Sequence, residues 1–169
     1  MHRTSGLAQL RQIVRQYRFI KKKMKIEKSE RAWIFLYGTF MSARILRDHG
    51  IDCDNTQPAR LNGYRLSIRP RVNLTPCADT QVFGGLALLS HEEIFSLYKG
   101  LKRDFQIIYN PYGVLAEIPD GTIRPALCYI SPHIPDADPD PAYVNELAEC
   151  AREMLAPESY VNHIKRFNK

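Results

Sequence analysis

From residue 32 onward, strand and helix patterns follow one another with no linker, and this order constrains the fold more than any other feature. Apolar or alternating segments rich in β-branched and aromatic residues predict strands, and apolar residues at helical spacing predict helices. The predicted strands are 33–38, 59–70, 80–90, 105–109, 112–118 and 123–130, and the predicted helices are 42–50, 90–100, 142–155 and 157–167. The proline-rich segment 131–141 is predicted to be a loop.

Local signals refine this order. The Asp-Gly pair at 120–121 lies between two apolar runs and predicts a β-hairpin. Ser90 and Glu93 form a capping box that begins the second helix. The glycine pair at 84–85 within a strand indicates a bulge or a close approach of another backbone. Hairpins combined with helical crossovers favour an α+β fold, a small mixed or antiparallel β-barrel flanked by helices, over a doubly wound parallel sheet.

The length and charge distribution indicate one domain, residues 32–169, behind a basic N-terminal extension, residues 1–31. A chain of 169 residues is long enough for one core. The net charge is +6, but residues 1–31 contain 10 basic and 2 acidic residues, so the remaining 14 basic and 16 acidic residues give the domain a net charge of −2. We therefore expect no nucleic-acid partner for the domain. No apolar run approaches the ~18 residues of a transmembrane segment.

The extension is open to several interpretations. Its arginine-rich, amphipathic beginning is typical of an organelle transit peptide, and its lysine-rich end could contact anionic lipid. The alternatives are a disordered extension or translation that begins at Met24. We expect a cytoplasmic protein, with organelle targeting through the extension as the alternative.

The residues that commonly carry metal or cofactor chemistry are scattered. The four cysteines are widely spaced, and no cysteine or histidine has a second ligand at zinc spacing. Free thiols and a reducing compartment are expected, and no metal or cofactor. No phosphate-binding or dinucleotide-binding glycine motif is present.

One turn could bind a ligand. Gly38 and Thr39 end an apolar strand and precede a helix, where backbone N–H groups and a hydroxyl could hold a carboxylate or an oxyanion. A tight turn without a ligand would have the same sequence.

Taken in order, the segments resemble the gamma-glutamylcyclotransferase-like family, which includes the avirulence-induced-gene-like proteins. The similar segments, from residue 33 to residue 167, are LYGTFM, Arg44-Ile45-Leu46, LNGYRL, Asn73-Leu74-Thr75-Pro76, VFGGLALL, Ala126-Leu127-Cys128-Tyr129 and CAREMLAPESY. The resemblance implies a pocket for a gamma-glutamyl amine or peptide, and its substrate-binding residues would be Tyr37, Gly38, Thr39, Phe40 and Tyr129. The implied reaction is intramolecular: the substrate's α-amine attacks its γ-carbonyl and releases 5-oxoproline and an amine, without a cofactor.

The sequence departs from the family at the catalytic residue. A Glu-Gly pair that ends a helix supplies the family's general acid/base, and Lys99-Gly100 occupies that position here. A protonated lysine cannot accept a proton. Three possibilities remain open: a neutral Lys99 acts as the base, Glu117 or Asp104 replaces the missing carboxylate, or the chain is an inactive binding module in which Lys99 could pair with an anionic ligand.

Overall fold

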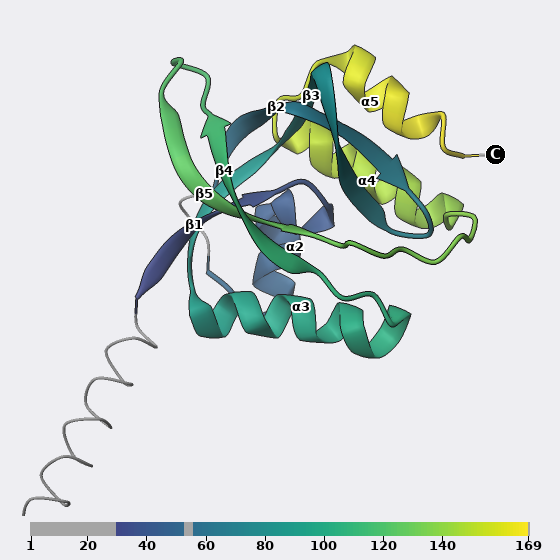
Figure 1. Cartoon of the computed structure of the whole chain (residues 1–169), viewed down its shortest axis with the longest axis horizontal. Coiled ribbons are helices and arrows are strands. Elements are labelled where there is room, and N and C mark those ends of the chain that lie inside the picture. Colours follow the sequence, from purple (N-terminus) through teal and green to yellow (C-terminus); the bar gives the residue numbers. More distant parts are fainter. Residues whose placement is uncertain (1–29, 53–55, 169) are drawn as a thin grey trace, which may run out of the picture.

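A computed structural model describes residues 30–52 and 56–168 (Figure 1). The predicted extension lies outside them, apart from its last two residues. The elements are β1 (Arg31–Leu36), the 3-10 turn η1 (Thr39–Met41), α2 (Ala43–Asp48), β2 (Gln57–Ile68), β3 (Val72–Ser90), α3 (His91–Phe105), β4 (Asn110–Glu117), β5 (Ile123–Ile130), α4 (Pro141–Glu153) and α5 (Glu158–Lys165).

The five strands form one closed barrel in the order β1-β3-β2-β4-β5. Strands that follow each other in the chain pair as antiparallel neighbours at the β2–β3 and β4–β5 hairpins, and β1 is antiparallel to β3. The barrel closes where β1 and β5 run parallel, with Ile34 opposite Leu127. On the other side, β2 and β4 meet at one registered pair, Arg60 and Glu117. This mixed topology confirms the predicted α+β fold.

The local signals in the sequence correspond to observed features. The turn at 120–121 joins β4 to β5, and Gly121 has a φ of 86°, which favours glycine. The side chain of Ser90 accepts a hydrogen bond from the N–H of Glu93, and the side chain of Glu93 accepts one from the N–H of Ser90. The segment 131–140 has no regular secondary structure, as predicted.

Two boundaries predicted near α3 are wrong. The helix does not end at Gly100 but continues to Phe105, and residues 106–109 are not a strand. The apolar spacing explains the difference, because Leu101 and Phe105 extend the face of the helix that begins with Ile94 and Leu97. Gln106 then ends the helix with a left-handed φ of 57°.

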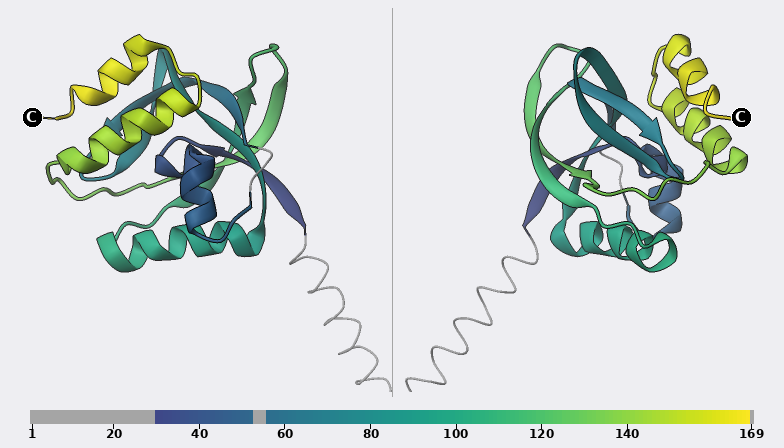
Figure 2. Two further views of the ribbon diagram at one scale, coloured as in Figure 1. Left: turned by 180° about the vertical axis from the view of Figure 1, so that it is seen from behind. Right: turned by 45° about the vertical axis from the view of Figure 1, so that its right-hand side comes forward.

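The helices lie around the barrel, with α3 on one side and the α4–α5 pair on another (Figure 2). Ser42 occupies the N-cap position of α2, but its hydroxyl makes no cap hydrogen bond with the helix backbone and donates instead to the carboxylate of Glu153 on α4. This hydrogen bond ties α2 to α4. None of the described helices is long and apolar enough to cross a membrane.

The core lies inside the barrel and beneath the helices. Its largest fully buried side chains are Phe35, Ile34, Leu36, Met41, Leu46, Leu61, Ile68, Leu74, Leu86, Leu89, Leu97 and Ile107. Burial of apolar surface on this scale is the main force that holds the strands and helices together.

Gly84 shows why the sequence needs a glycine within β3. A Cβ atom on Gly84 would overlap the carbonyl oxygen of Leu36, and it would lie 3.1 Å from the ring of Phe35. The predicted close approach of a second backbone is therefore present, and it brings the end of β1 against β3.

We expect Gly84→Ala to lower the free energy of unfolding by about 3 kcal/mol, because the added methyl group overlaps a backbone atom that cannot move without breaking the sheet. Gly100→Ala is the matched control. Its Cβ would meet nothing within 4 Å, and alanine favours a helix interior by about 1 kcal/mol. Urea unfolding of both variants measures the difference, and equal stability of the two would contradict the close approach.

Candidate functional site

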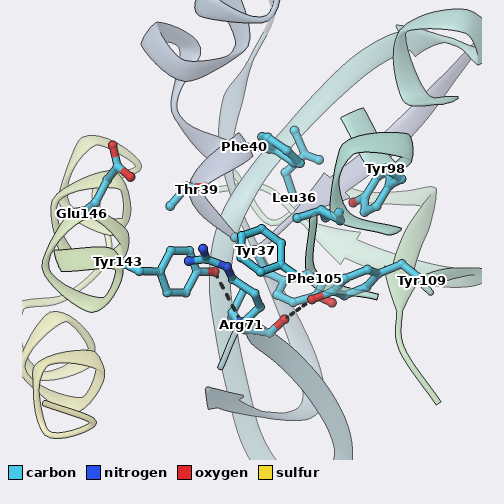
Figure 3. Close-up of a pocket in the computed structure, with 13 residues that line it drawn as sticks. Leu36, Tyr37, Thr39, Phe40, Arg71, Tyr98, Phe105, Tyr109, Tyr143 and Glu146 are labelled. Atoms are coloured by element: carbon cyan, nitrogen blue, oxygen red, sulfur yellow. Dashed lines mark hydrogen bonds between the residues drawn. The ribbon is translucent and has the colours of Figure 1, made fainter. Parts of the chain in front are cut away.

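The loop that follows β1 forms one wall of a cavity of about 220 Å³ (Figure 3). Helices α3 and α4, the start of β3 and the segment before β4 form the other walls. The lining residues are Leu36, Tyr37, Gly38, Thr39, Phe40, Arg71, Val72, Tyr98, Leu101, Phe105, Tyr109, Tyr143 and Glu146. We call this cavity the aromatic pocket. Four of the five predicted substrate-binding residues, 37–40, lie in its lining.

The loop offers backbone donors to the pocket. Gly38 has an extended conformation and precedes η1, whose first N–H groups, on Thr39 and Phe40, have no partner within the turn. None of the hydrogen bonds among the described residues has the N–H of Thr39 or of Phe40 as its donor. A Cβ on Gly38 would lie 3.1 Å from a methyl group of Val72, so the small residue lets the loop lie close to β3.

Hydrogen bonds of three tyrosine hydroxyls connect the segments around the pocket. The hydroxyl of Tyr37 donates to the carbonyl oxygen of Tyr129 (2.6 Å), and that of Tyr109 donates to the carbonyl oxygen of Val72 (2.8 Å). The N–H of Val72 donates to the hydroxyl oxygen of Tyr143 (3.3 Å). Burial raises the pKa of Tyr143 to about 12 and raises the pKa of Tyr37 and of Tyr109 above their usual range. These hydroxyls therefore stay protonated at neutral pH.

Tyr98 is the centre of the aromatic wall. Its ring stacks on Tyr129 with centroids 4.2 Å apart, lies edge-on to Phe40 at 6.2 Å and is tilted against Tyr109 at 5.7 Å. Tyr129, the fifth predicted substrate-binding residue, thus lies directly behind the pocket wall. Contacts of this kind fix ring positions and leave a flat apolar surface for a ligand.

The pocket contains one cation with no acidic partner. The guanidinium carbon of Arg71 lies 4.0 Å from the ring centroid of Phe105 and 4.2 Å from that of Tyr143. No carboxylate among residues 30–52 and 56–168 forms an ion pair with it. Glu146 is the carboxylate in the lining, and it faces Arg44 at 3.7 Å with about half of its side chain exposed. The interior of the pocket therefore favours an anion.

Lys99 lies outside the aromatic pocket. Its side chain is exposed, and its nitrogen is 6.0 Å from the ring centroid of Phe95. It borders a neighbouring hollow between α3 and the side chains of Phe40 and His49, which shares Phe40, Leu101 and Phe105 with the aromatic pocket. The helical period explains this position. Tyr98, Leu101 and Phe105 occupy the face of α3 toward the pocket, and a residue next to Tyr98 is rotated about 100° from it.

The two carboxylates considered as substitutes also lie elsewhere. Glu117 borders a hollow between β2 and the segment that joins α4 to α5, where it accepts hydrogen bonds from Arg60 (2.5 Å) and Asn62 (3.2 Å). It does not border the aromatic pocket. Asp104 borders the same hollow as Lys99 and accepts a hydrogen bond from its neighbour Arg103 (2.6 Å). The arginines lower the pKa of both carboxyl groups.

Sequence reasoning missed most of the pocket, because residues 37–40 were the only ones it predicted among the thirteen that line it. It did not identify Arg71. It also did not identify the lining residues that come from α3, from α4 and from the segment preceding β4, which are Tyr98, Leu101, Phe105, Tyr109, Tyr143 and Glu146. A signal existed for α3, because the apolar residues from Ile94 to Phe105 recur at helical spacing and include Tyr98 but not Lys99.

The described part of the chain contains no group of three or more His, Cys, Asp or Glu side chains placed to hold a metal ion. Cys77, Cys128 and Cys150 are free thiols, and Cys53 lies outside the described residues.

We expect Tyr37→Phe to lower the free energy of unfolding by about 2 kcal/mol, since it leaves the partly buried carbonyl of Tyr129 without this donor. Pro111 lies opposite Tyr129 in the register and has no N–H to replace it. Tyr112→Phe, on the exposed surface, is the control. Urea unfolding that finds both variants equal to the wild type would contradict this role of Tyr37.

The Arg60–Glu117 pair gives a pH-dependent contribution to stability. Because the folded-state pKa of Glu117 is lowered, the contribution is present above the ordinary value of 4.5 and is lost as the pH falls through the folded-state pKa. We expect Glu117→Gln to destabilise the protein at pH 7 and to have a diminishing effect below pH 4.5. In an Arg60→Gln background this pH dependence should vanish, and its persistence in urea unfolding would show that another group causes it.

No family model matches the sequence, and no curated protein does. Solved structures do. A protein described as gamma-glutamyl cyclotransferase superposes with a TM-score of 0.65 and 17% identity over 80% of this chain and 87% of its own. YkqA from Bacillus subtilis gives a TM-score of 0.68 and 21% identity over 86% of this chain, which spans 57% of YkqA. A yeast gamma-glutamyl cyclotransferase specific to glutathione gives 0.58 and 11% identity over 82% of this chain and 96% of its own.

Identities this low establish the architecture and not the activity. The strand order, the loop after β1 and the similarity to these structures agree with the resemblance found in the sequence. The chain therefore has the gamma-glutamyl cyclotransferase-like fold.

Proposed function

We propose that the chain binds a gamma-glutamyl compound in the aromatic pocket and does not cyclise it. The observation that carries this proposal is the placement of charge around the pocket. Arg71 is a cation in the lining without an acidic partner, whereas Lys99, at the family's carboxylate position, is absent from the lining and borders a neighbouring hollow.

Support for binding comes from the donors and the walls. A gamma-glutamyl group carries a carboxylate and an amide carbonyl, both of which accept hydrogen bonds. The N–H groups of Thr39 and Phe40 and the guanidinium of Arg71 are donors in one cavity. The rings around them exclude water, which strengthens these interactions.

Support for the absence of turnover comes from the missing base. Cyclisation requires a group that takes the proton of the attacking amine and returns a proton to the leaving nitrogen, within hydrogen-bond reach of both. Lys99 and Asp104 do not line the pocket but a hollow beside it, and Glu117 borders another hollow. The tyrosine hydroxyls stay protonated, so they do not replace the base.

A second candidate function is cyclotransferase activity with Glu146 as the base. Glu146 is the carboxylate in the lining of the aromatic pocket, and its partner Arg44 is 3.7 Å away and half exposed. An ion pair this exposed contributes little energy, so a substrate could separate it.

Binding is tested by calorimetric titration of the full chain with gamma-glutamyl-alanine. We expect saturable binding that Leu101→Trp abolishes, because the larger ring fills the pocket. Leu115→Trp makes the same substitution on the exposed surface of β4 and should leave binding intact. Ligand at about 100 times the dissociation constant should add about 2.7 kcal/mol to the free energy of unfolding. Absence of binding, or equal binding by both variants, would contradict the pocket assignment.

Turnover is tested by measuring 5-oxoproline after incubation with the same ligand. We expect no release above the buffer control from the wild type or from Lys99→Ala and Glu117→Gln. Release that disappears in Glu146→Gln would establish the second candidate and refute the binding-only proposal.

A further inference from the structure

We infer that Arg71 selects the ligand of the aromatic pocket: it pairs with a second carboxylate, so the pocket takes a gamma-glutamyl amino acid or short peptide in preference to a gamma-glutamyl amine. This inference rests on the proposed function and adds the chemistry of the other half of the ligand. The resemblance to the family alone does not distinguish a gamma-glutamyl amine from a gamma-glutamyl peptide as the ligand.

The orientation of Arg71 supports this role. Its guanidinium lies between the rings of Phe105 and Tyr143, which come from different helices, with distances of 4.0 and 4.2 Å to the two centroids (Figure 3). Ring stacking uses the faces of the guanidinium, whereas its N–H donors point outward in the plane. Those donors have no hydrogen-bond acceptor among the described residues. A carboxylate matches this planar set of donors with two parallel hydrogen bonds.

The surrounding charges leave Arg71 uncompensated. Arg69, two residues earlier, pairs with Asp136 at 2.7 Å on the surface, and Glu146 of the pocket faces Arg44. The two rings that flank Arg71 are neutral, because Phe105 has no ionisable group and burial raises the pKa of Tyr143 to about 12. A guanidinium partly removed from water and lacking a counter-ion makes a bound anion favourable and a bound ammonium group unfavourable.

The pocket has donors for two acceptor groups of a ligand. The N–H groups of the loop after β1 and the guanidinium from the start of β3 belong to different elements but line one cavity of about 220 Å³. A ligand whose gamma-glutamyl end contacts the loop can place a second carboxylate on Arg71. A simple amine on that side leaves the guanidinium buried against the ligand without a partner, which reduces affinity.

The test compares gamma-glutamyl-alanine with gamma-glutamyl-ethylamine, which differs from it by the absence of the alanine carboxylate. We expect the wild type to bind the dipeptide at least tenfold more tightly than the amine in calorimetric titrations at pH 7. Arg71→Gln should weaken dipeptide binding about tenfold or more and leave amine binding within about threefold of the wild type. Arg71→Lys keeps the charge but not the planar donors, and it should retain part of the preference.

Controls separate recognition from folding. Arg69→Gln removes a nearby arginine that does not line the pocket, and it should leave both affinities unchanged. The thermal unfolding midpoint of each ligand-free variant shows whether the removal of Arg71 also loosens α3 or α4.

The outcomes distinguish the two proposals. The role of Arg71 is refuted if the wild type binds the two ligands with equal affinity. It is also refuted if a folded Arg71→Gln protein loses equal affinity for both ligands. Neither result refutes the binding of a gamma-glutamyl compound. Failure of the wild type to bind either ligand refutes both proposals.

Discussion

The parallel pairing of β1 with β5 is the contact on which both the barrel and the pocket depend. It joins strands that are far apart in the chain, and it brings the end of β1 beside Tyr129 of β5, where the hydroxyl of Tyr37 donates to the Tyr129 carbonyl. On the other side of β1, Gly84 lets β3 approach the Leu36 carbonyl. Because β1 is paired on both sides, Gly38 and Thr39, which follow it, have a fixed position at the pocket wall.

In the proposed function, the pocket built on this frame holds an anion, and Lys99, Asp104 and Glu117 are all absent from its lining. Backbone donors, a stacked guanidinium and neutral tyrosines surround the cavity. The carboxylates at positions 104 and 117 already have arginine partners in other hollows. Binding and catalysis make separate demands on the residues of this fold: a pocket needs donors and walls, whereas cyclisation also needs a base within reach of the attacking amine. On this interpretation, the fold preserves the first set of requirements and not the second.

Much of this architecture was predictable from local signals. The hairpin at 120–121, the capping box at Ser90 and the close approach at Gly84 each depend on a few neighbouring residues, and each is present. The predicted end of α3 at Gly100 is wrong because the apolar spacing that continues to Phe105 keeps the chain helical past this glycine. The residues that line the pocket opposite the loop were harder to predict, because the positions of Arg71 and Tyr143 depend on how α3 and α4 pack around the barrel, and no local pattern specifies that packing.

The central claim is that the aromatic pocket holds an intact gamma-glutamyl compound between the loop after β1 and Arg71. A crystal structure of the full chain soaked with gamma-glutamyl-alanine tests this most directly. The claim predicts an uncleaved amide bond, an oxygen of the gamma-glutamyl group within hydrogen-bond distance of the Thr39 or Phe40 N–H, and the alanine carboxylate on the guanidinium of Arg71. Density for 5-oxoproline in the pocket, or a ligand bound elsewhere with the pocket filled by water, would contradict it.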